Sequence, residues 1–170
     1  MLGIQINCTY KMKLTFEHLR SHPEHYKTVA NWLESAWGAY YPDYSDQDWI
    51  DSQVPPNAGL NEFPITYIAL DHSTQPPTPM GTVFLRAGHP EVFSEPCVEM
   101  AGLFVPETQR RKGIGSYLIQ EVCHAAKGLG YDQIFLFTYV DFEIYLKNGW
   151  EITKHFKYRN KDNVIMQKLL

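Results

Sequence analysis

The feature that most constrains this sequence is a basic, glycine-containing turn, Arg110-Arg-Lys-Gly-Ile-Gly-Ser116. The apolar run before it, Cys97 to Val105, predicts a strand that Pro106 ends. The segment after it, Ile114 to Lys127, carries apolar residues at helical spacing. A strand that turns through glycines into a helix presents unpaired N–H groups and the positive end of the helix dipole. This arrangement suits an anion, most naturally a phosphate.

Two other phosphate-binding motifs do not fit the turn. A Walker A loop ends in Gly-Lys-Ser/Thr, whereas Gly115-Ser116-Tyr117 lacks the lysine. A dinucleotide fingerprint needs a third glycine at position 118, which is Leu118. The pattern alone therefore leaves two interpretations. Arg110, Arg111 and Lys112 add positive charge to an anion site, or the segment is an ordinary basic turn at a helix start.

The remaining pattern predicts alternating strands and helices. Residues 23–37 and 45–50 read as helices, the second capped by Ser45. The C-terminal two thirds reads β-β-β-α-β-α-β-β, which indicates a layered α/β domain with a mixed sheet. Its predicted strands are 65–70, 80–87, 97–105, 134–137, 151–158 and 164–169, and its predicted helices are 114–127 and 142–147.

Composition excludes several classes of protein. A chain of 170 residues with 44% hydrophobic residues is long enough for one folded domain. The net charge of −4 disfavours nucleic acid as a partner. No apolar run is long enough to span a membrane, and the N-terminus does not resemble a secretory signal. Cys8, Cys97 and Cys123 are scattered, so neither a zinc site nor a disulfide framework is expected. We therefore expect a cytoplasmic protein.

Three motifs resemble the GCN5-related N-acetyltransferase family. The turn resembles its motif A, Arg/Gln-x-x-Gly-x-Gly/Ala, through Arg110, Gly113 and Gly115. The segment Glu99-Met-Ala-Gly-Leu-Phe-Val105 resembles its fourth strand, and Ile144-Tyr-Leu-Lys-Asn-Gly-Trp150 resembles its Leu-Tyr-x-x-x-Gly-Phe segment. The resemblance covers residues 64–170 and implies a mixed, mostly antiparallel central sheet flanked by helices, in the order β-α-α-β-β-β-α-β-α-β-β. Residues 1–170 would form one domain, with 1–60 as a variable acceptor-side part and 64–170 as the acetyl-CoA-binding part.

The resemblance also implies an activity, the transfer of an acetyl group from acetyl-CoA to a primary amine by direct attack. Backbone N–H groups of the turn would hold the pyrophosphate, and the end of the fourth strand would pair with the pantetheine arm. Many relatives contact the cofactor through an Asn where this chain has Thr138, and a common Ala three residues later is Asp141 here. The implied cofactor-binding residues are Leu103, Phe104, Val105, Arg110, Arg111, Lys112, Gly113, Ile114, Gly115, Ser116 and Thr138.

Two residues are candidates for proton transfer. Tyr145 falls at the family's position for the general acid, although a half-buried tyrosine could equally be a packing residue. Glu99 lies where some relatives carry a catalytic Glu, and could be the general base that deprotonates the acceptor ammonium. The alternatives are that Glu99 is a solvated strand carboxylate and that a water chain removes the proton. An acyl-CoA-binding module or sensor without catalysis would share the turn and not need these two residues.

The acceptor side is less clear. Residues 32–51 interleave aromatic residues with acids, which would suit a cationic small-molecule amine. The alternative is that the aromatic residues are core and the acids form a solvated helix face. His18, His22 and His25 are interpreted as a surface cluster and not as a metal site. Homodimers are frequent among relatives, but no interface is recognisable here. The aromatic residues are Trp32, Trp37, Tyr40, Tyr41, Tyr44 and Trp49, and the acids are Glu34, Asp43, Asp46, Asp48 and Asp51.

Overall fold

A computed structural model describes residues 12–140 and 142–170, so Cys8 and Asp141 lie outside the described residues. The strands are β1 (Leu14–His18), β2 (Ile65–Asp71), β3 (Thr78–Ala87), β4 (Val98–Phe104), β5 (Gln133–Thr138), β6 (Glu151–Tyr158) and β7 (Lys161–Leu169). The α-helices are α1 (Tyr26–Trp37), α2 (Asp46–Asp51), α3 (Ile114–Gly128) and α4 (Phe142–Lys147). Short 3-10 turns are η1 (Leu19–Ser21), η2 (Pro23–His25), η3 (Gly38–Tyr40) and η4 (Glu107–Gln109). Within these residues, no helix is both long and apolar enough to cross a bilayer.

The seven strands form one sheet in the order β1-β2-β3-β4-β5-β7-β6. Every neighbouring pair is antiparallel except β4 and β5, which are parallel. The predicted fold class and the predicted order of elements are therefore confirmed.

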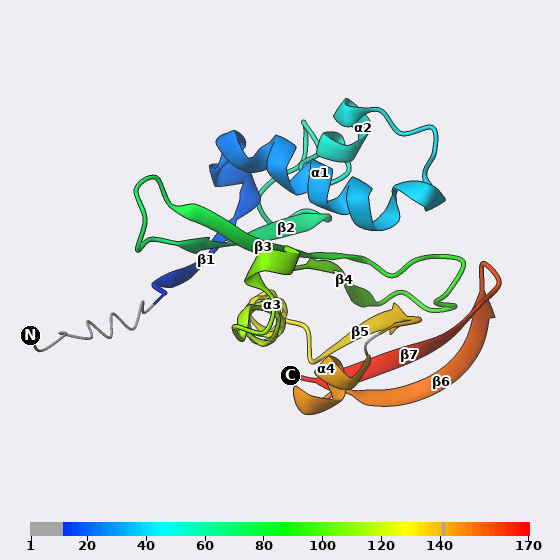
Figure 1. Cartoon of the computed structure of the whole chain (residues 1–170). Coiled ribbons are helices and arrows are strands. Elements are labelled where there is room, and N and C mark those ends of the chain that lie inside the picture. The colour runs from blue at the N-terminus through cyan, green and yellow to red at the C-terminus, as the bar shows by residue number, and fades with distance from the viewer. Residues whose placement is uncertain (1–11, 141) are drawn as a thin grey trace, which may run out of the picture.

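Helices cover both faces of the sheet, with α1 and α2 on one side and α3 on the other (Figure 1). Strand β2 is covered on both faces, because every one of its residues is buried. Tyr67 and Ala69 face the core under α3, whereas Ile68 and Leu70 face the core under α1. A strand covered on both faces reads as a continuous apolar run for this reason.

Helix α3 follows the predicted pattern. Its buried residues recur at helical spacing and pack on the sheet, while the other side of the helix faces solvent. The first helix differs at its start, because Pro23–His25 forms a 3-10 turn and the α-helix begins at Tyr26. Helix α2 is capped by Ser45 as predicted, and the Asp48 carboxylate accepts from the Ser45 N–H at 2.8 Å to complete a capping box.

The hairpin of β6 and β7 is tighter than predicted. The sequence indicated a polar turn over residues 160–163, whereas Tyr158 already pairs with Lys161. The turn therefore consists of Arg159 and Asn160 alone, with φ of 48° and 60°. Two central residues with positive φ match the twist of the flanking strands, which lets the ladder continue to the turn.

Strand β4 is irregular at the point where it leaves β5. Glu99 and Phe135 are the one registered pair between these two strands in the described chain. On the other side, the register with β3 shifts between Thr82 and Phe84. Gly102 lies in this bulge with φ of 60°, and a Cβ there would lie 2.0 Å from the Phe84 ring. Glycine is therefore required at this position, both for its φ and for the close approach of Phe84.

Candidate active site

A cleft of about 1230 Å³ opens where β4 and β5 separate. Its walls come from the ends of β4 and β5, the start of α3, helix α4, the α1–α2 segment and the β6–β7 turn. All of the site residues predicted from the sequence line this cleft except Lys112. The Lys112 ammonium donates to Gln109 Oε1 at 2.8 Å instead.

The basic turn places the start of α3 at one end of the cleft. Arg111 and Gly113 both have positive φ, at 61° and 82°, which turns the chain sharply into the helix. The first bond of the helix runs from the Tyr117 N–H to the Gly113 carbonyl at 3.0 Å. The N–H groups of residues 114–116 therefore have no partner within the helix, and they lie at the positive end of its dipole. Arg110 supports the turn, since its Nε donates to the Val105 carbonyl at 3.0 Å.

Helix α4 is held against the start of α3 by Asn148. Its Nδ2 donates to Ser116 Oγ at 3.1 Å and to the Ile144 carbonyl at 2.8 Å. Gly115 permits the close packing of the two helices, because a Cβ there would lie 3.0 Å from Ile144 Cδ1. The two motifs that the sequence separates by about thirty residues are thus in direct contact.

The edge of β4 that faces the cleft has no strand partner after Glu99 in the described residues. Leu103 and Phe104 lie on this edge, and both side chains are half-buried and line the cleft. An unpaired strand edge offers N–H and C=O groups to an extended ligand.

Thr138 lines the cleft at the end of β5 but uses its hydroxyl locally. The hydroxyl donates to the Val140 carbonyl at 2.8 Å and accepts from the Val140 N–H at 3.2 Å. These contacts shape the turn after β5.

Tyr145 is half-buried on α4 and lines the cleft. Its ring packs edge-on against Trp150, with ring centroids 6.1 Å apart. The Tyr145 carbonyl also accepts from the Trp150 N–H at 3.1 Å. The side chain therefore has a packing role and also borders the open space.

Glu99 is buried, with 1% of its surface exposed, so the alternative of a solvated strand carboxylate is wrong. Its Oε1 accepts from the Arg86 guanidinium at 2.7 Å, and its Oε2 accepts from the His89 N–H at 2.9 Å. Both carboxylate oxygens of Glu99 therefore have a hydrogen-bond partner. Glu99 nevertheless lines the cleft.

His89 is a cleft residue that the sequence did not reveal. It lies in the β3–β4 loop, and its ring packs edge-on against Phe137 and Tyr158. Burial, together with the nearby Arg86 guanidinium, lowers the pKa of His89, which favours the neutral imidazole. No local pattern in the loop indicated that its ring would lie in this cleft.

The far end of the cleft is aromatic but not acidic, and several of its aromatic residues also belong to the core under α1, as the alternative expected. Five of the six aromatic residues predicted for the acceptor side line it, and Trp32 instead stacks on Phe104 at 5.7 Å. Asp48 belongs to the cap of α2, and none of the five predicted acids lines the cleft within the described chain. The acidic part of that prediction is therefore wrong. The alternative of a solvated face holds for four of these acids, which are exposed: Glu34, Asp43, Asp46 and Asp48.

Two cations that the sequence analysis passed over line this end instead. The Arg159 guanidinium lies 5.5 Å from the ring centres of Tyr40 and Tyr41 and 5.3 Å from that of Tyr158. The Lys161 ammonium lies 3.9 Å from the ring centre of Tyr139. Both residues come from the β6–β7 hairpin, which thus closes this end of the cleft.

The histidines and cysteines outside the cleft do not suggest further chemistry. His22 contacts Glu17 at 2.7 Å and Glu24 at 3.1 Å, while His18 belongs to β1. The described residues contain no group of three or more His, Cys, Asp and Glu side chains placed to hold a metal ion. Burial raises the pKa of Cys97 and of Cys123 to about 11, so both thiols stay protonated and weakly nucleophilic.

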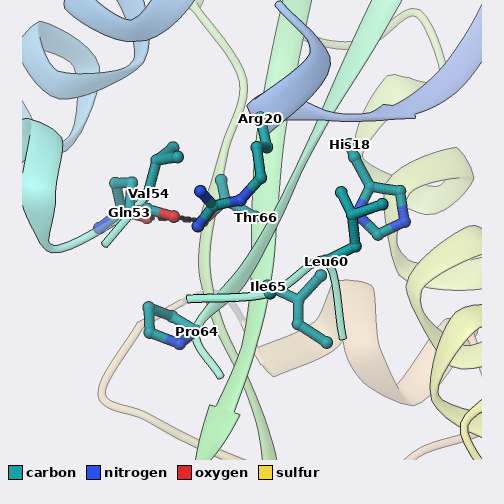
Figure 2. Close-up of a pocket in the computed structure, with 9 residues that line it drawn as sticks. His18, Arg20, Gln53, Val54, Leu60, Pro64, Ile65 and Thr66 are labelled. Atoms are coloured by element: carbon teal, nitrogen blue, oxygen red, sulfur yellow. Dashed lines mark hydrogen bonds between the residues drawn. The ribbon is translucent and has the colours of Figure 1, made fainter. Parts of the chain in front are cut away.

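A second pocket lies beneath α2, between η1 and β2 (Figure 2). Its volume is about 10 Å³, which is no more than one water molecule requires. Its polar groups are already bonded, since Arg20 donates to the Pro55 carbonyl at 2.8 Å and Thr66 donates to the Gln53 carbonyl at 2.9 Å. The large cleft is therefore the candidate active site.

Comparison with known proteins agrees with this geometry. The sequence profile of the acetyltransferase (GNAT) family matches residues 26–148, and the chain belongs to this family. The match includes α1, the basic turn, α3 and Tyr145. Among curated protein sequences, none matches the chain.

Solved structures share the fold at low sequence identity. An aminoglycoside 6'-N-acetyltransferase complexed with coenzyme A is 18% identical, with a TM-score of 0.68 over 91% of this chain and 96% of that one. The NatC complex bound to Gag peptide and CoA is 18% identical, with a TM-score of 0.64 over 94% and 99%. Arabidopsis thaliana NAA60 in complex with acetyl-CoA is 15% identical, with a TM-score of 0.63 over 93% and 99%. The first is an aminoglycoside acetyltransferase and the second binds a peptide, so the fold alone does not define the acceptor of this chain.

Proposed function

We propose that this protein transfers the acetyl group of acetyl-CoA to a primary amine by direct attack within a ternary complex. The observation that carries the proposal is a juxtaposition in one cleft. The free N–H groups at the start of α3, the unpaired edge of β4, Tyr145 and Glu99 all border the same space.

The chain's own groups fit the donor substrate. The N–H groups of residues 113–116 would bind the pyrophosphate, with Arg111 adding positive charge at the same turn. Leu103 and Val105 would hydrogen-bond the pantetheine arm through their main chain, as an added strand does. Gly113 has nothing within 4 Å of a built Cβ, which leaves the turn open to a bulky phosphate group.

The reaction forms a bond between the amine nitrogen and the acetyl carbon, and it breaks the bond from that carbon to sulfur. An N–H of the β4 edge near Leu103 would stabilise the carbonyl oxygen as it becomes negative. The Tyr145 hydroxyl would give its proton to the departing thiolate. The acceptor ammonium loses two protons in all, one before the attack and one after it, and the second replaces the proton that Tyr145 has given to the thiolate.

Glu99 would draw the first of these protons away from the acceptor ammonium. Each of its oxygens accepts one hydrogen bond, from Arg86 or from the His89 N–H, and a carboxylate oxygen has a further lone pair with which to accept a proton. Since only 1% of its surface is exposed, we propose that the proton reaches it through water in the cleft. Glu99→Gln should then lower kcat more at neutral pH than at pH 9, where more of the amine is already neutral.

Calorimetric titration with acetyl-CoA, CoA and ATP tests the proposal directly. We expect one-site binding of acetyl-CoA and CoA and none of ATP. Thiol release in the presence of amines then separates the enzyme from a CoA-binding module, which would bind the same ligands without turnover. Failure to bind either CoA species would refute both functions. The cytoplasmic location and a homodimeric state stay predictions.

A further inference from the structure

The far end of the cleft carries two cations, Arg159 and Lys161, for which the described residues provide no ion-pair partner. The two glutamates that line the cleft are both paired, Glu99 with Arg86 at 2.7 Å and Glu143 with Lys147 at 3.7 Å. Arg159 and Lys161 have no carboxylate within 4.0 Å among residues 12–140 and 142–170. This surplus lies in a chain whose net charge is −4, so it does not reflect a generally basic surface.

Both cations are held in position. Three tyrosine rings surround the Arg159 guanidinium at 5.3–5.5 Å, and its Nη1 donates to the Tyr40 carbonyl at 3.4 Å. Hydrogen bonding from Lys161 lowers the pKa of Tyr40 and also places the ammonium between Tyr40 and Tyr139. Aromatic faces hold a guanidinium without using all of its N–H donors. Donors of Arg159 therefore remain available to a ligand.

The same contacts disfavour a polycationic acceptor. A cationic amine would bind to aromatic faces or to carboxylates. Here the faces of Tyr40, Tyr41, Tyr139 and Tyr158 carry the protein's own cations, and the aspartates of the α1–α2 segment lie outside the cleft. A second positive charge at this end would be repelled by Arg159 and Lys161.

A short series of contacts connects this end to the proposed base. Glu99 accepts from the His89 N–H, and the His89 ring lies 5.8 Å from the Tyr158 ring, over which Arg159 lies. One ring contact, between His89 and Tyr158, and one cation–π contact, between Tyr158 and Arg159, therefore connect the charged end to the residue that donates to the proposed base. Glu99, Arg159 and Lys161 all line the same cleft.

From these observations we propose that Arg159 and Lys161 bind a carboxylate of the acceptor, so that the acceptor is a small primary amine that also carries a carboxylate. The inference rests on the proposed function, since it names the acceptor class of that same site. The carboxylate takes no part in the bond changes and serves to orient the amine toward the β4 edge. A guanidinium fork and a planar carboxylate match in geometry, which gives recognition as well as charge.

Matched acceptor pools provide the first test. Thiol release from acetyl-CoA is measured with a pool of the common α-amino acids and ω-amino acids, with a pool of the corresponding carboxamides, and with a pool of diamines and aminoglycosides. We expect the carboxylate pool to react at least 10-fold faster than either other pool. Equal or faster turnover of carboxamides or polycations overturns the inference, as does acetyl-CoA binding without turnover of any pool.

Variants provide the second test, on the best acceptor of the carboxylate pool and its own carboxamide. Loss of a charge-assisted hydrogen bond predicts that Arg159→Gln lowers kcat/KM for the carboxylate about 10- to 100-fold, mainly through KM. The carboxamide should change less than about 3-fold, and Lys161→Gln should show the same selectivity with a smaller effect. Lys154→Gln is the matched control, because Lys154 is an exposed cation on β6 outside the cleft lining.

The two proposals fail separately. If Arg159→Gln affects the carboxylate and the carboxamide equally, Arg159 only supports the hairpin and the inference is wrong, while acetyl transfer stands. If acetyl-CoA does not bind in the calorimetric titration, the proposed function itself is wrong. Calorimetry on Arg159→Gln should give an unchanged Kd for acetyl-CoA, because the β6–β7 turn that carries Arg159 lies away from α3 (Figure 1).

Discussion

The two ends of the cleft are built in different ways. The end near α3 consists of consecutive residues, in which the end of β4, the turn and the first residues of the helix follow one another in the chain. The end near the β6–β7 hairpin is assembled from distant segments, and the contact between Arg159 and Tyr40 joins residues 119 positions apart. The first end offers mainly backbone groups, and the second offers side chains. Under the proposed function, the first end would bind the donor substrate and the second end the acceptor.

The largest effect we expect is on the structure that both ends share. Gly102→Ala should destabilise the protein by about 2–4 kcal/mol, since it combines a strained φ with overpacking. A Cβ at this position would lie 2.0 Å from the Phe84 ring. Gly130→Ala is the matched control, because its φ of 91° is also positive but nothing lies within 4 Å of the added carbon. Urea unfolding measures the free energy of unfolding of both variants, and the difference between them reports the clash with Phe84. An equal loss of stability in the two variants would show that Phe84 moves aside easily.

Tyr145→Phe should reduce kcat about 100-fold or more while changing the Kd for acetyl-CoA less than about 2-fold. The hydroxyl is proposed to act only on the departing thiolate, and general acid catalysis contributes on this scale. Steady-state kinetics and calorimetry measure the two quantities. Tyr131→Phe, an exposed tyrosine outside the cleft, should leave both unchanged. Full activity of Tyr145→Phe would show that Tyr145 is not the general acid and serves only to pack against Trp150.

Gly113→Ala should weaken acetyl-CoA binding about 10-fold, because a side chain at a φ of 82° costs about 1–2 kcal/mol unless the turn shifts. A shift would misalign the N–H groups at the start of α3. The Kd from calorimetry tests this, again with Gly130→Ala as the control of equal strain. If the two variants bind acetyl-CoA equally well, the turn does not hold the phosphates.

The smallest effect we expect concerns the acids of the α1–α2 segment. Asp43→Asn and Asp46→Asn should change the acceptor KM less than about 2-fold, since neither carboxylate lines the cleft. The comparison is with Arg159→Gln, measured on the same acceptor. A large rise in KM for the aspartate variants would mean that the acceptor is cationic and enters over this segment.

The parts of the site that could be predicted are those encoded locally. The turn, the start of α3 and the cap at Ser45 each depend on a few adjacent residues, and all three are confirmed as structure. The burial of Glu99 could not be predicted, because it depends on Arg86 from β3 and on the His89 loop. The β6–β7 turn was placed wrongly because neither Arg159 nor Asn160 is the glycine that usually marks two positive φ values. Arg159 lies in that turn and Lys161 directly follows it, so the positive charge at this end of the cleft was not predicted either.

The hydrogen bonds of Asn148 restrict the relative motion of helices α3 and α4. Its amide bonds both to Ser116 at the start of α3 and to the Ile144 carbonyl of α4, next to Tyr145. The relative placement of the two helices is therefore fixed once, when the chain folds, and does not have to be found again in each catalytic cycle. Ligands then meet groups that are already arranged, and the entropy of ordering them does not weaken binding.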